Sequence, residues 1–73
     1  NLTEKEKDIL YGQILGLNGV VQKKDIIKAW KNKIEKYHPD KVNHLGIEFR
    51  IFAEKKTKDL NRAYLYFKRK YKL

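Results

Sequence analysis

The chain has 73 residues and no cysteine, and its 18 lysines and arginines against 9 acidic residues give a formal net charge of +9. A single domain of this size buries only about 60% of the surface that its unfolded chain exposes, and the lack of cysteine excludes a disulfide framework and a thiolate zinc site. The positive charge favours an acidic partner and does not choose among nucleic acid, an anionic membrane and an acidic protein surface.

The first predicted helix covers residues 4–15. Thr3 and Glu6 are spaced as in a capping box, in which each residue satisfies a backbone N–H of the other. Gly16 then ends the helix, since glycine tolerates the left-handed conformation. Gly12, inside the helix, is unfavourable by up to ~1 kcal/mol relative to alanine, so we expect it to pack closely against a neighbour. The apolar candidates at helical spacing are Ile9, Leu10, Ile14 and Leu17.

The second predicted helix covers residues 22–37 and has the clearest pattern. At about 100° per residue, one face gathers four apolar side chains, which we expect in the core: Ile26, Trp30, Ile34 and Tyr37. The opposite arc is mostly lysine, whereas Lys33 falls on the apolar side and must extend its ammonium group outward. Pro39 disfavours helical geometry at His38, so the helix ends there and a loop runs to about Gly46.

The third predicted helix covers residues 47–70. Its apolar positions recur at intervals of three and four: Phe49, Phe52, Ala53, Leu60, Ala63, Tyr64 and Phe67. Two long helices on either side of one loop should pack as an antiparallel hairpin, with the first helix over their seam. The sequence therefore predicts an all-α fold and one domain over residues 1–73, which we expect to come from a longer protein because the chain lacks an initiator methionine.

Other kinds of site find little support in the sequence. His38 and His44 lie six positions apart, which is poor spacing for a metal site, and we expect neither a metal nor a cofactor. No window approaches the roughly 18 consecutive apolar residues of a membrane span, and the start of the chain lacks the apolar stretch of a signal peptide. We therefore expect a soluble, cytoplasmic domain whose only membrane contact would be through parts outside this chain.

Three segments of the chain resemble the J-domain of the Hsp40 (DnaJ) co-chaperones. "ILGL" at residues 14–17 is similar to the end of the family's first helix, and "DIIKAWKNKIEKYHPDK" at residues 25–41 to its second helix and signature loop. "AEKKTKDLNRAYLYF" at residues 53–67 is similar to the third helix and looks most like the J-domains at the C-terminus of membrane-anchored, DjlA-type proteins. A lone His-Pro-Asp would be weak evidence for the family, but here the triplet has the expected segments on both sides.

The resemblance implies that the chain binds Hsp70 in its ATP state and stimulates its ATPase. His38, Pro39 and Asp40 match the signature that J-domains need for this, and the loop would dock where the Hsp70 nucleotide-binding domain meets its linker. The basic face of the second helix would lie against an acidic surface of Hsp70. The lysines expected to steer this encounter are Lys28, Lys31, Lys36 and Lys41.

Several positions depart from the family's usual residues. Arginine or lysine is common where Ile27 and Asn32 stand, so the basic strip is thinner there. Gly12 and Trp30 stand where the family often has tyrosine. Lys33 stands where a core leucine is common, and Thr57 where phenylalanine is usual. We expect three other apolar side chains to compensate in the core: Ile34, Ile51 and Phe52.

Three alternatives remain open. A small helical nucleic-acid-binding domain fits the charge, but the most organised basic face is almost purely lysine, and the three arginines, at positions 50, 62 and 69, look scattered. An enzyme using His38 and Asp40 as an acid–base pair lacks a nucleophile, a metal set and room for a substrate pocket. A J-like domain that binds Hsp70 without stimulating it is the third, and the intact signature argues against it.

Overall fold

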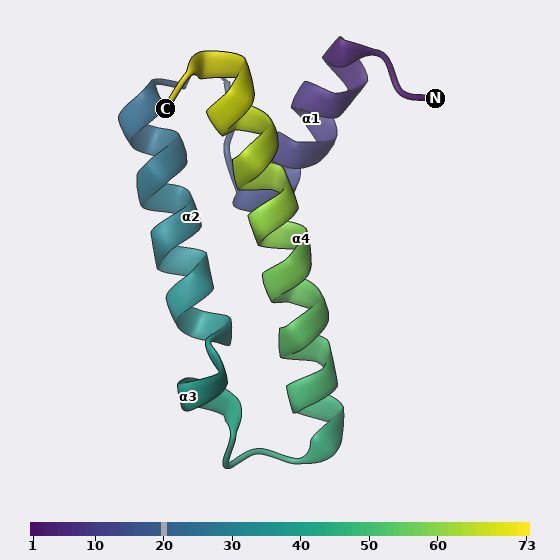
Figure 1. The fold of residues 1–73 in the computed structure, drawn as a ribbon, viewed down its shortest axis with the longest axis vertical. Helices are drawn as coiled ribbons and strands as arrows, with labels where there is room; N and C mark the ends of the chain where they lie inside the picture. Colours follow the sequence, from purple (N-terminus) through teal and green to yellow (C-terminus); the bar gives the residue numbers. More distant parts are fainter. Residues whose placement is uncertain (20) are drawn as a thin grey trace.

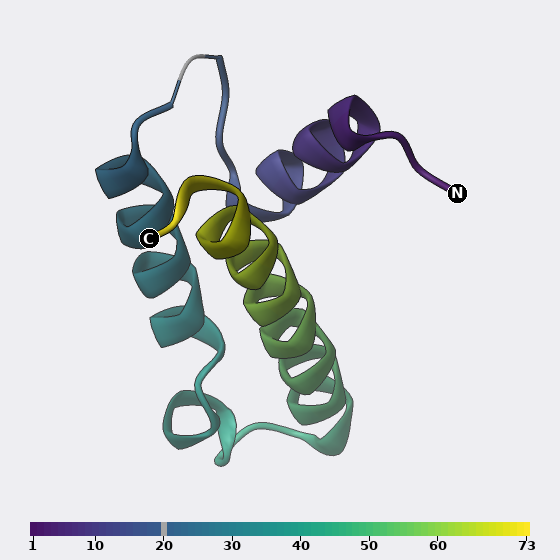
Figure 2. The same ribbon diagram turned by 45° about the horizontal axis from the view of Figure 1, so that its top comes forward.

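The computed structural model describes residues 1–19 and 21–73, and the regular structure in this part is helical (Figure 1). The helices are α1 (Glu4–Leu15), α2 (Lys23–Tyr37), α3 (Pro39–Val42) and α4 (Ile47–Tyr71). α2 and α4 lie side by side and run in opposite directions, while α1 packs mainly against α4 and also contacts α2 (Figure 2). The predicted all-α class and the antiparallel hairpin are confirmed.

The two ends of α1 have the predicted caps. The Thr3 hydroxyl accepts from the Glu6 N–H at 3.1 Å, and the Glu6 carboxylate accepts from the Thr3 N–H at 2.9 Å. Gly16 ends the helix with φ 77°, a conformation that costs glycine little. A Cβ at position 16 would lie only 3.1 Å from Cε of Lys33. The aliphatic stem of Lys33 therefore crosses this turn, as expected for a lysine on an apolar face.

One hydrophobic cluster joins the three longer helices at the α1 end of the hairpin, which we call the core end. Its buried members are Leu15 of α1, Ile26 of α2, and Leu60, Ala63 and Phe67 of α4. Leu15 was missing from the apolar positions predicted for α1. Two positions that were predicted, Ile9 and Leu10, are exposed, because α1 turns the side carrying Tyr11 and Leu15 toward the cluster. Ile14 and Leu17 pack at its edge.

At the opposite end of the hairpin, apolar side chains of the long helix that were predicted to pack in the core are exposed. Phe49, Ile51 and Phe52 are 63%, 61% and 51% exposed, so Ile51 and Phe52 do not compensate for missing core residues, whereas Ile34 packs against the cluster. The cause is length. At 1.5 Å per residue α4 is about 37 Å long and α1 only about 18 Å, and α1 covers the C-terminal half of α4 alone (Figure 1).

A polar lock fixes α1 to α4. The Lys70 ammonium donates to both Asp8 carboxylate oxygens, at 2.7 and 2.6 Å, and the Tyr66 hydroxyl donates to the same carboxylate. The hydrogen bond from Lys70, followed by the one from Tyr66, lowers the pKa of Asp8. Burial and the bond to Asp8 raise the pKa of Tyr66 to about 12. These three side chains, which we call the Asp8 lock, hold α1 in place at the core end.

Candidate partner-binding site

The His-Pro-Asp triplet forms a turn of helix rather than the open loop that the sequence predicted. His38 ends α2 with φ −60° and ψ 141°, the extended geometry that a following proline favours, and Pro39 is the first residue of α3. The Lys41 N–H donates to the His38 carbonyl at 2.8 Å, and the Asn43 N–H donates to the Pro39 carbonyl at 2.9 Å. Proline suits the first helical position because its missing N–H would have had no partner in the helix. The prediction of a continuous loop to Gly46 is therefore wrong for residues 39–42.

The two polar side chains of the triplet both face solvent. Nδ1 of His38 accepts from the Asp40 N–H at 3.2 Å and caps α3. With Nδ1 acting as the acceptor, the ring proton sits on Nε2, which is left to donate to another molecule. The Asp40 carboxylate lies 3.7 Å from Nδ1, and the two side chains are 52% and 86% exposed. The turn thus presents one donor and one anionic acceptor from a fixed backbone.

The predicted lysines are all exposed, and they fall into two groups. Lys28 and Lys31 lie on the solvent side of α2. Lys36 and Lys41 come from α2 and α3 and line the same shallow hollow, together with Asn32 and Glu35. The structure therefore brings Lys36 and Lys41 next to the His-Pro-Asp turn. Lys28 lies about 12 Å from Lys36 along the helix axis.

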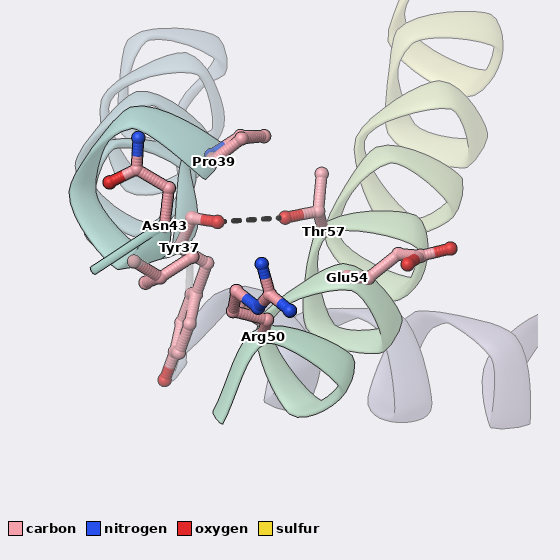
Figure 3. A pocket seen from close by; sticks show the side chains of 8 residues that line it. Tyr37, Pro39, Asn43, Arg50, Glu54 and Thr57 are labelled. Atoms are coloured by element: carbon pink, nitrogen blue, oxygen red, sulfur yellow. Dashed lines mark hydrogen bonds between the residues drawn. The ribbon is translucent and has the colours of Figure 1, made fainter. Parts of the chain in front are cut away.

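A second hollow, of about 390 Å³, lies between α3 and α4 on the other side of the turn (Figure 3). Its walls include Tyr37, Pro39 and Ala53, and the Arg50 side chain lies between Tyr37 and Glu54. Four residues that sequence reasoning had not connected to the turn line it: Asn43, Arg50, Glu54 and Thr57. The available signal was Thr57 itself, which is smaller than the phenylalanine usual at that position.

Thr57 links the long helix to the end of α2. Its hydroxyl donates to the Tyr37 carbonyl at 3.4 Å, one residue before His38. That carbonyl belongs to the last turn of α2, where the helix itself supplies no N–H partner. The bond is long, so it stabilises the junction weakly. Among the described hydrogen bonds, it is the one that joins the end of α2 to α4 next to the turn.

Two aromatic residues orient α2 on α4. Trp30 stacks on Tyr64 with ring centroids 4.4 Å apart and an interplanar angle of 17°. Its indole N–H also donates to the Asn61 side-chain oxygen at 3.0 Å. Tyr37 packs against the core and meets Phe52 edge-on at 6.0 Å. The prediction that Trp30 and Tyr37 are packing residues is confirmed, although both remain partly exposed.

Within residues 1–19 and 21–73, no three histidine, aspartate or glutamate side chains gather into a group that could hold a metal ion. No helix in the same part combines the length and the apolar character needed to cross a membrane.

Known proteins with DnaJ in their names match the chain over 54 residues each. It is 37% identical to chaperone protein DnaJ of Fusobacterium nucleatum subsp. nucleatum over 54 residues, which are 74% of the chain and 14% of that protein. It is 41% identical to the DnaJ homolog subfamily C member 7 homolog of Dictyostelium discoideum over 54 residues, 74% of the chain and 10% of that protein. The chain belongs to the J-domain family. The matched part of this J-domain is thus a small fraction of either relative's length.

No family model matches this chain, and no solved structure matches it. The names of the matched DnaJ proteins agree with the family resemblance seen in the sequence. The finer resemblance to DjlA-type proteins stays a prediction. So do the roles of the individual site residues.

Proposed function

We propose that this J-domain is an Hsp70 co-chaperone module that binds ATP-state Hsp70 of the DnaK type and stimulates its ATPase. His38, Pro39 and Asp40 form the centre of the contact. The lysines around them are Lys28, Lys31, Lys36 and Lys41. The observation that carries the proposal is the triplet's geometry, with both polar side chains exposed on a short helical turn beside Lys36 and Lys41. The chaperone names of the DnaJ relatives support it.

The shape of the turn suits docking. Pro39 fixes one backbone dihedral, and the two backbone bonds across α3 hold the rest of the turn. A contact loop that is already ordered loses less conformational entropy on binding, so more of the interaction energy remains as affinity. Asp40 can accept charge-assisted hydrogen bonds from an arginine of Hsp70, while Nε2 of His38 donates to an acceptor.

The lysines act at longer range. They are exposed and lie along α2 and on α3, so they raise the rate of encounter with an acidic surface more than they raise the final affinity. This attraction weakens as salt is added, because the Debye length falls to about 8 Å at physiological ionic strength. The J-domain acts on Hsp70 allosterically, by binding one of its conformations better than another.

The test is single-turnover ATP hydrolysis by a purified Hsp70 at about 150 mM salt, titrated with the J-domain and with its His38→Gln variant. His44→Gln is a matched control, since it makes the same change in the other histidine, which is also exposed. We expect the native domain and His44→Gln to raise the rate and His38→Gln to leave it unchanged, with all three equally helical by circular dichroism. If the native domain stimulates none of several Hsp70s, the proposal is wrong.

A further inference from the structure

A groove on the α1 side of α4 concentrates positive charge that the Hsp70 contact does not use. It has a volume of about 420 Å³, and besides Lys70 of the Asp8 lock its lining has three cations, Lys7 of α1 and Arg62 and Arg69 of α4. The expectation that the arginines are scattered is wrong for these two. They are seven residues apart, which is two turns of helix, and so they project from the same side of α4.

The groove also has an apolar and aromatic lining. The rings of Tyr11 and Tyr66 lie 4.9 Å apart and are tilted by 37°. Leu65 lines the same groove and is 43% exposed. Because Tyr66 belongs to the Asp8 lock, the wall that it forms is held between the two helices. The groove therefore offers fixed cations and apolar surface side by side.

The three cations are available to a ligand. Lys7, Arg62 and Arg69 are exposed, and none of them makes an ion pair within the part of the chain that the structure describes. Lys70, which also lines the groove, is bound to Asp8. An arginine guanidinium can bind a carboxylate through two parallel hydrogen bonds, which adds geometric selectivity to the attraction between the charges.

We propose that this α1–α4 groove binds an acidic, partly apolar peptide segment of a protein partner. Arg62 and Arg69 are about 10 Å apart along the helix axis. A peptide in the polyproline II conformation advances about 3.1 Å per residue with three residues per turn, so carboxylates three residues apart lie on one side of it and match that spacing. The side chains between them can cover Leu65 and the tyrosine rings. The spacing and the mixed lining together define the kind of sequence that the groove fits.

A peptide fits the groove better than a nucleic acid does. Glu4 also lines the groove, and its exposed carboxylate lies 3.9 Å from the Lys70 ammonium. A continuous phosphate backbone would pass this carboxylate and be repelled by it, whereas a peptide can place a neutral residue there. The apolar surface of Leu65 also favours a peptide, because an apolar side chain of the peptide can cover it.

The groove is separate from the proposed Hsp70 contact. Its described lining comes from α1 and α4 alone, and the N-terminal part of α1 points away from α2 (Figure 2). The His-Pro-Asp turn lies at the far end of the hairpin (Figure 1). Both surfaces can therefore be occupied at once, and the groove does not depend on the Hsp70 proposal.

The experiment is an NMR titration of the isotope-labelled J-domain with two short peptides of equal length and equal glutamate content, one repeating Glu-Leu-Leu and the other repeating Glu-Ser-Ser, so that carboxylates recur at every third residue. The variant pair is Arg62→Gln/Arg69→Gln against Lys28→Gln/Lys31→Gln, which removes the same charge from α2. We expect the leucine peptide to bind more tightly and to shift the amides of Lys7, Leu65 and Tyr66. The double arginine variant should bind it about tenfold or more weakly, and the lysine variant should bind it nearly as well as the native domain.

A further variant separates guanidinium geometry from charge. Arg62→Lys/Arg69→Lys keeps both charges and loses the planar fork, so we expect binding weaker than native and tighter than the glutamine pair. Equal losses in the arginine and lysine variants, or shifts confined to α2, would mean that only net charge is being measured and would overturn the proposal. Binding of single-stranded DNA in the groove, with no binding of either peptide, would overturn the assignment of a peptide.

Discussion

The two ends of the helical hairpin differ in how they are held. At the core end, the Asp8 lock and five buried side chains from three helices fix α1, α2 and α4 together. At the loop end, which we define as His38, α3, residues 43–46 and the first turns of α4, Ala53 is the one described residue that is buried. Phe49 and Phe52 stay exposed there, and the Thr57 hydroxyl makes a single long bond to the end of α2.

This difference separates stability from the proposed contact. A small domain has little apolar surface to bury, and here most of the buried surface lies at the core end. The loop end is left with polar groups and apolar side chains that face solvent, which a partner can cover. We therefore expect core-end substitutions to change the free energy of unfolding, and loop-end substitutions to change binding with little change in stability.

Leu60→Ala should have the largest effect on stability. Leu60 is buried in the cluster, so its truncation leaves a cavity and destabilises the domain by about 2–5 kcal/mol. Urea unfolding followed by circular dichroism measures this loss. Ile51→Ala, on the same helix at an exposed position, is the matched control and should change the free energy of unfolding by less than about 0.5 kcal/mol. Equal losses in the two variants would remove the distinction between the two ends.

Asp8→Asn should destabilise the domain by about 1–2 kcal/mol, since it removes a carboxylate that accepts from Lys70 and Tyr66. The pH dependence has a definite sign. The pKa of Asp8 is lowered from 3.8, so the lock contributes fully above that pH and is lost as the pH falls through the lower folded value. The stability difference between native and variant should therefore shrink below about pH 4. A difference that stays constant from pH 7 into acid would contradict the lock.

Gly12→Ala should stabilise the domain by up to about 1 kcal/mol. Gly12 is buried within α1, but a Cβ there would meet only the Leu17 carbonyl oxygen, at 3.9 Å, which is an ordinary contact. The close packing expected at Gly12 thus leaves room for a methyl group. Thermal unfolding of the variant measures the gain, and stimulation of Hsp70 should stay unchanged because the substitution lies at the core end. A lower melting temperature would show that α1 sits closer to its neighbours than the structure has it.

Thr57→Val should have the smallest effect on stability, about 0.5 kcal/mol, because it removes one long hydrogen bond and keeps the shape of the side chain. Its effect on function should be larger than its effect on folding, since the junction before His38 becomes less well held. We expect a higher concentration for half-maximal stimulation of Hsp70, and Thr57→Ser should restore the native value. Identical titration curves for valine, serine and threonine would show that the hydroxyl does not position the turn.

The sequence predicted the features that depend on local chemistry. The capping pair at Thr3 and Glu6, the glycine stop at Gly16 and the proline stop after Tyr37 each place a helix end through its nearest neighbours in the chain. The site triplet was also found in sequence, because its flanking segments carry the family resemblance. Local signals of this kind need no knowledge of which helices meet.

The sequence failed where tertiary contacts decide the outcome. Apolar periodicity marks one face of α4, but it cannot tell how much of that face α1 is long enough to cover, so Phe49 and Phe52 were placed in the core. The meeting of Thr57 with Tyr37 depends on how α2 and α4 pack, and so does the groove that contains Arg62 and Arg69. The spacing of the two arginines shows only that they share one side of α4, and a contact between two helices cannot be read from such a spacing.

The most direct test of the central claim is single-turnover Hsp70 ATPase stimulation by His38→Gln and Asp8→Asn, measured side by side with the native domain at neutral pH and a temperature at which all three are folded. Asp8→Asn weakens the core end and should still stimulate at the native level. His38→Gln leaves the core end intact and should not stimulate. Stimulation that survives in His38→Gln, or that falls in Asp8→Asn while the domain remains folded, would contradict the assignment of the Hsp70 contact to the loop end.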